Sequence, residues 1–226
     1  MLASLDGILL IIHIFFGTAA LLSGPVAIFA KKANRWHRGA GKIFALSMTF
    51  VFVTAVVLAA MHNIPFLFMI SFLSYYSVFA GVRIIFLKQL HKGQRPRWYD
   101  WLAGVITILA GMLFVAYGSF VWIQHGFQAL VVLSLIFGGF TALLGYNNLR
   151  PFWKRPEHPL HWWFYHMGNM LGGYAAALTA FLVTMAGRME IHSPVVWLAP
   201  LVLLLIASPF LRRHYKRKFG LVGQKI

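Results

Sequence analysis

The sequence predicts an all-α fold, a polytopic transmembrane bundle of seven helices, from three observations: long apolar runs, few charges and an uneven placement of the basic residues. Of 226 residues, 60% are hydrophobic and 11% are charged, whereas soluble domains carry about 25% charged residues. An apolar run of about 20 residues can cross a bilayer as a helix. The runs are continuously apolar rather than alternating, which favours helices over a barrel.

Seven such runs fill most of the chain. They are Leu5–Phe29, Lys42–Met61, Pro65–Leu87, Trp101–Ile123, Phe127–Asn148, His161–Ala186 and Pro194–Leu211. The first is too long for a cleavable signal peptide and lacks a basic leading segment. The connections are mostly short, so we expect a single transmembrane domain over residues 1–226, with neighbouring helices antiparallel.

Local signals set several helix starts. Asn34 can cap an extended second helix that includes His37. Asn63 before Ile64 and Pro65 predicts the start of the third helix, with Asn63 as its N-cap and Pro65 as an early proline. Asp100 lies near the start of the fourth helix, where a negative charge suits the helix dipole. Small residues also recur along two helices, at Gly104, Gly111 and Gly118 and at Gly168, Gly172, Ala176 and Ala180. Such stripes allow close helix packing, or leave room for a flat cofactor.

The basic residues are sorted by these seven crossings. Nineteen of the 20 Lys and Arg residues fall on one side, and only Arg188 falls on the other. Because short loops rich in Lys and Arg stay in the cytoplasm, we expect the N-terminus outside, the C-terminus inside and a multi-pass protein of the cytoplasmic membrane. The net charge of +16 then predicts contact with the lipid bilayer and its anionic headgroups, and argues against nucleic acid as a partner.

Composition excludes several kinds of chemistry. The chain has no cysteine, so disulfides and thiolate-bound clusters are excluded. All four acidic residues lie at or beyond the predicted helix ends. We therefore expect no buried carboxylate, which weakens an ion-coupled transporter. The predicted seventh helix contains no lysine, so a retinal Schiff base is also excluded.

Histidines are the candidate chemistry, because ionisable residues inside a membrane often mark functional sites. His13 lies about 6 Å outward of the middle of its helix and His166 about 11 Å inward, at 1.5 Å per residue. They therefore belong to different layers. His37 and His166 lie near the same inner boundary, with Gly41 and Gly173 close by along their helices.

Two histidines on two helices, each near a glycine, predict a haem b site with His37 and His166 as metal ligands. His13, near Gly17, would contribute to an outer site with His62, His125 or His192. Such a protein would pass electrons, with a redox partner or a second copy of itself as partner. Packing through hydrogen bonds is the alternative role for His13 and His166.

Other functions stay open, and the sequence does not decide whether the protein is an enzyme. The residues Ser71, Ser74, Tyr75, Ser77, Gly138, Gly139 and Gly145 motivate a transporter or channel for a neutral or apolar solute. An accessory subunit without catalysis is a third possibility. The run His158-x-x-His161-x-x-x-x-His166 resembles part of the membrane di-iron hydroxylase boxes, but too few histidines accompany it.

One family resemblance covers most of the chain. It rests on His13-x-x-x-Gly17, on Trp36-His37-Arg38-x-x-Gly41-Lys42, and on His166-Met167 followed by the segment from Gly173 to Phe181. With these motifs the chain resembles a family of bacterial multi-pass membrane proteins known only as a domain of unknown function, numbered 2306. The resemblance implies a helical bundle in a prokaryotic cytoplasmic membrane and supplies no activity.

Overall fold

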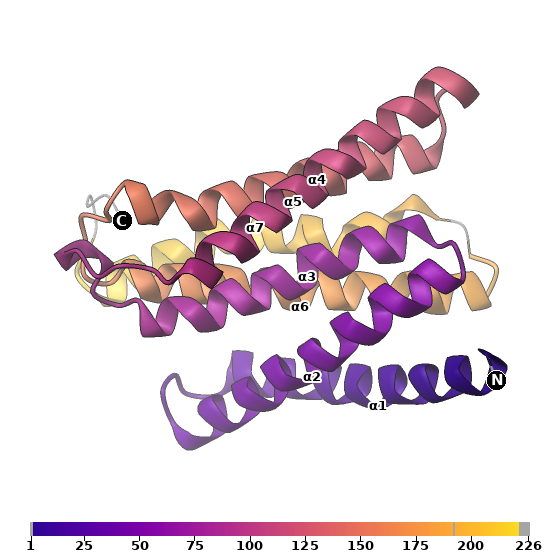
Figure 1. Ribbon diagram of the computed structural model, residues 1–226. Coiled ribbons are helices and arrows are strands. Elements are labelled where there is room, and N and C mark those ends of the chain that lie inside the picture. Colours follow the sequence, from indigo (N-terminus) through magenta and orange to yellow (C-terminus); the bar gives the residue numbers. More distant parts are fainter. Residues whose placement is uncertain (1, 192, 222–226) are drawn as a thin grey trace.

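The computed structural model describes residues 2–191 and 193–221, and this part of the chain is helical (Figure 1). Its helices are α1 (Leu2–Phe29), α2 (Arg35–Met61), α3 (Pro65–Arg83), α4 (Trp98–His125), α5 (Ala129–Trp153), α6 (His161–Arg188) and α7 (Pro194–Lys218). Two short 3-10 turns, η1 (Ile84–Phe86) and η2 (Leu90–Lys92), connect α3 to α4. All seven α-helices are long and apolar enough to span a membrane. The predicted fold class is therefore confirmed.

The helices lie in three tiers (Figure 1). The α4–α5 pair forms one outer tier and the α1–α2 hairpin the other, with α3, α6 and α7 between them. Helix α3 is central, since it packs against α2, α4, α5 and α6. The connections α1–α2, α3–α4 and α5–α6 and the last turn of α7 lie at one end of the bundle, which we call the basic end.

All three predicted helix starts are confirmed, and two of them have the expected side-chain acceptor. The side chain of Asn34 accepts a hydrogen bond of 2.8 Å from the backbone N–H of His37, so α2 starts ahead of its apolar run. Asp100 lies in the first turn of α4, where its carboxylate accepts from the backbone N–H of Arg97 at 2.9 Å. A side-chain acceptor at either place satisfies an N–H that has no partner within its helix.

The prediction that Asn63 caps the third helix is wrong. Asn63 has a φ of +52°, in the left-handed region, and Ile64 is the N-cap residue of α3 without a side-chain hydrogen bond. Asparagine is one of the few residues other than glycine that adopts this region readily. Asn63 therefore closes the α2–α3 turn, while Pro65 is the first residue of α3, as expected.

Buried side chains join the three tiers. Phe66 and Met69 of α3 pack with Phe137 of α5 and Ala176 of α6, and a second cluster unites α1, α2 and α3 around Met48. In contrast, many large apolar side chains point outward, among them Phe15, Leu22, Leu113 and Leu203. Such an apolar exterior suits lipid as the surrounding medium.

The glycines of α4 serve close packing against α5. A Cβ atom added at Gly111 would lie 2.4 Å from the backbone nitrogen of Ala142 and 2.6 Å from the carbonyl oxygen of Gly138. At Gly104 an added Cβ atom would collide with the side chain of Leu149. This stripe therefore brings α4 and α5 into close contact and leaves no space between them for a flat cofactor.

Candidate functional site

His37 projects from the first turn of α2 at the basic end. Its Nδ1 atom lies 2.8 Å from the carbonyl oxygen of Ala27, in the last turn of α1. Lys32 donates to the same carbonyl at 3.3 Å and also to the carbonyl of Ile28. The last carbonyls of a helix have no N–H partner within that helix, and these contacts supply hydrogen-bond donors to them. The contacts also hold the His37 ring in place.

His166 lies in the second turn of α6 and also contacts a carbonyl of a neighbouring helix. Its Nδ1 atom lies 2.8 Å from the carbonyl oxygen of Gly81, near the end of α3. Gly81 also lets α6 pack closely against α3, because an added Cβ atom would lie 2.9 Å from the sulfur of Met170 and 3.2 Å from Cβ of Asn169. The His166 ring is thus fixed between α3 and α6, as His37 is between α1 and α2.

The structure brings His37 and His166 together. Their ring centroids are 6.2 Å apart and their planes meet at 82°. Since Nδ1 of each ring faces a carbonyl, each neutral imidazole carries its proton on Nδ1 and leaves Nε2 as an acceptor or ligand. Within the described chain, no hydrogen bond uses Nε2 of either ring.

His13 lies apart from this pair. Its Nδ1 atom contacts the hydroxyl of Thr54 at 2.9 Å, across the α1–α2 hairpin. His62, a proposed partner of His13, instead pairs with Asp6 at 2.9 Å. His125 ends α4 as an exposed residue, and His192 lies outside the described residues. The structure therefore gives His13 a hydrogen bond between helices and brings it to none of the described candidates.

The three predicted glycines differ in their surroundings. A Cβ atom added at Gly17 or Gly41 would meet no atom within 4 Å. At Gly173 it would lie 2.6 Å from Cγ2 of Val78 and 3.2 Å from the carbonyl oxygen of Ser74. Gly173 therefore packs α6 against α3, and Gly41 is the open glycine near the His37–His166 pair.

A second group of histidines lies at the basic end. His161 is fully buried at the start of α6, with its ring centroid 5.9 Å from that of His91. Its Nδ1 atom lies 3.1 Å from the carbonyl oxygen of His158, and its Nε2 atom has no partner. Across residues 2–191 and 193–221, no three His, Asp or Glu side chains converge as a metal site.

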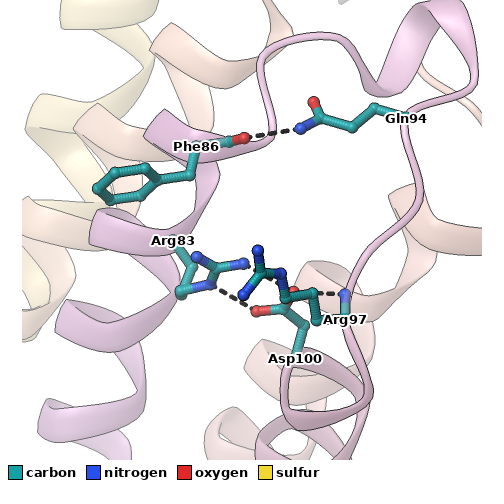
Figure 2. A network of polar contacts seen from close by, with 5 residues as sticks. All are labelled: Arg83, Phe86, Gln94, Arg97 and Asp100. Carbon is teal, nitrogen blue, oxygen red and sulfur yellow. Dashed lines mark hydrogen bonds and ion pairs between the residues drawn. The ribbon is translucent and has the colours of Figure 1, made fainter.

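The expectation of no buried carboxylate is wrong. Asp100 is only 3% exposed, and Arg83 of α3 donates to both of its oxygens (Figure 2). The ring of Tyr99 lies beneath the Arg83 guanidinium, whose carbon is 4.8 Å from the ring centroid. The sequence held one signal for this pair: a lone acid at the start of one helix follows an arginine at the end of the preceding helix.

Five of the seven residues that motivated a solute pathway are packed between helices, whereas Tyr75 is partly buried and Gly139 is exposed. Ser71, Ser74 and Ser77 are buried, and each hydroxyl donates to a carbonyl of its own helix. Gly138 and Gly145 face α4 at close range. These five residues therefore contribute to helix packing, and the transporter alternative stays a prediction.

Comparisons with known proteins identify no relative. No protein-family model matches the chain, and no curated protein or solved structure gives a significant match. The family resemblance drawn from the sequence motifs stays a prediction.

Proposed function

We propose that this integral membrane protein binds haem b at the basic end, with His37 and His166 as axial ligands, and that it passes electrons. The observation that carries the proposal is the 6.2 Å separation of the two imidazole rings. Two nitrogens that bind one metal from opposite sides lie about 4 Å apart, given bonds of about 2 Å. Adding the distance from each nitrogen to its ring centre gives centroids about 6 Å apart, close to the observed value.

The hydrogen bonds of the two rings support the same role. Metal-bound histidine usually donates its other ring N–H to a carbonyl or carboxylate, which fixes the tautomer and the ring orientation. Both His37 and His166 face a backbone carbonyl with Nδ1, at 2.8 Å. In both rings Nε2 is therefore the nitrogen that is left to bind a metal.

The number of ligands favours haem over a bare ion. A structural zinc ion needs four ligands, and two imidazoles supply only half of that set. Haem iron takes four nitrogens from its own macrocycle and needs only axial ligands from the protein. When bound, haem would supply one-electron redox chemistry.

The surroundings of the pair suit such a group. Gly41 lies one turn along α2 from His37 and leaves space where other residues carry Cβ. The Lys32 ammonium is near enough to His166 to act on it electrostatically, and it would favour an anionic group such as a haem propionate. We also propose that the basic end faces the cytoplasm, because short basic loops are retained there.

The test is a visible spectrum of the detergent-purified protein after expression with ample haem. We expect a Soret band, and in the reduced state the sharp α-band of a six-coordinate haem. His37→Ala and His166→Gly should each abolish the six-coordinate spectrum, and added imidazole should restore it in His166→Gly. His13→Ala serves as the matched control, because His13 is also a partly buried histidine that bonds between helices.

Two results would refute the proposal. The first is a wild-type protein without a Soret band under these conditions. The second is a band that persists with unchanged position in both His37→Ala and His166→Gly while His13→Ala removes it.

A further inference from the structure

We propose that a pocket at the basic end binds a phosphate-type anion, independently of any haem. The pocket has a volume of about 320 Å³ and lies between the α3–α4 connection and the end of α5. Arg95 and Arg155 line it from opposite segments, with Trp101 and Phe152 among the other lining residues.

The charge of the pocket favours an anion. Both arginines are exposed, and no hydrogen bond or ion pair joins either of them to another described residue. No carboxylate lines the pocket. The nearby Asp100 carboxylate is already neutralised by Arg83 (Figure 2). The two guanidinium groups are therefore available, and guanidinium matches phosphate oxygens in both charge and geometry.

The backbone of the pocket is held in shape before any ligand binds. The Gln94 side chain donates to the carbonyl of Phe86 at 2.8 Å (Figure 2) and accepts from the N–H of Gln89 at 3.0 Å. Gly93 has a φ of +90°, and a Cβ atom there would touch the Arg155 guanidinium at 3.4 Å. The positive φ favours glycine at this turn, and the Arg155 guanidinium lies directly beside it. A preformed site loses less entropy on binding.

The apolar wall of the pocket favours an anionic lipid headgroup as the source of the anion. The rings of Trp101 and Phe152 pack edge to face, with centroids 5.4 Å apart, and Trp101 also stacks on Trp153. Tryptophan is typical of the bilayer interface, and basic pockets between helices at that level suit anionic lipid headgroups. A phosphate monoester in solution shares the recognised group, so the experiment must separate the two sources.

The first experiment measures ligand retention by native mass spectrometry of the full chain in detergent. The probes are phosphatidylglycerol, phosphatidylcholine and inorganic phosphate. We expect wild-type protein to retain phosphatidylglycerol over phosphatidylcholine, and Arg95→Gln with Arg155→Gln to weaken that binding about tenfold or more. The control pair, Arg213→Gln with Arg217→Gln, removes the same charge from exposed residues of α7 and should bind as wild type does.

The second experiment needs no variant and is independent of folding defects. Phenylglyoxal modifies accessible arginines, and peptide mapping reports each site. We expect phosphatidylglycerol micelles to protect Arg95 and Arg155 but not Arg213. Protection by phosphatidylglycerol alone identifies the lipid as the source, and equal protection by inorganic phosphate identifies a soluble anion. The proposal would be overturned if both variant pairs lost phosphatidylglycerol binding to the same extent. It would also be overturned if phenylglyoxal labelled all three arginines equally with every probe.

Discussion

Arg83 and Asp100 join α3 to α4 through two parallel hydrogen bonds, from Nε to Oδ1 at 2.6 Å and from Nη2 to Oδ2 at 2.9 Å. The same carboxylate accepts from the N–H of Arg97 at the start of α4. The side chain of Asp100 is 2% exposed and that of Arg83 is 20% exposed. One buried carboxylate therefore fixes the ends of two helices and the loop between them.

We expect Arg83→Ala to destabilise the protein strongly. The change leaves the Asp100 carboxylate buried without its counter-ion, and breaking a buried pair typically costs about 3 to 5 kcal/mol. The measurement is thermal unfolding in detergent, followed by circular dichroism.

The double change Arg83→Gln with Asp100→Asn provides the control for that result. It removes both charges and keeps polar groups in place, so it should recover much of the lost stability. A double variant as unstable as the sum of its single variants would show that the pair does not act as a unit.

We expect Gly111→Ala to separate α4 from α5. Its methyl group would meet backbone atoms of Ala142 and Gly138 at 2.4 and 2.6 Å, which cannot rotate away, and overpacking commonly costs about 1 to 3 kcal/mol. Gly139→Ala is the matched control, because Gly139 is exposed and a Cβ atom there meets nothing within 4 Å. Equal melting temperatures for the two variants would contradict the packing role.

We expect Asn169→Ala to weaken the contact of α5 with α6. The amides of Asn148 and Asn169 donate to each other's oxygens, at 3.0 and 2.7 Å. Such bonds contribute about 0.6 to 2 kcal/mol between membrane helices. Asn147→Ala changes an exposed neighbour and should leave thermal stability unchanged. The interpretation fails if the Asn147 variant loses as much stability as the Asn169 variant.

We expect the partial burial of Lys32 to make the protein slightly more stable at alkaline pH than at neutral pH. Burial lowers the pKa of Lys32 below its ordinary value of 10.5, so the folded state disfavours the ammonium form more than the unfolded state does. That cost is present at neutral pH and is relieved as pH rises through the folded pKa toward 10.5. Melting temperatures across this range should rise more for wild type than for Lys32→Met. Lys31→Met, at an exposed neighbour, should follow wild type, and identical slopes in all three proteins would disprove the effect.

Much of the fold followed from local patterns in the sequence. The length of each apolar run predicted a crossing, and the starts of α6 at His161 and α7 at Pro194 were predicted to the residue. Asn34 was predictable because a cap acts within a few residues. Asn63 was not, since its left-handed conformation depends on how α2 and α3 meet.

The candidate site was only partly predictable. The sequence placed His37 and His166 at similar depth, because depth follows from position along a helix. The sequence did not predict that Gly17 and Gly41 have open space beside them while Gly173 does not, because Gly173 is closed by Val78 on another helix. Asp100 was predicted at a helix end, but its burial follows from Arg83 reaching it across the α3–α4 connection.

The sequence by itself determined that the chain forms apolar helices and that its basic residues gather at one end, because lipid acts on each segment separately. Only the tertiary structure decided that His37 faces His166 while His13 bonds Thr54. The lateral order and rotation of helices arise from contacts between residues far apart in the chain, and no local pattern encodes them.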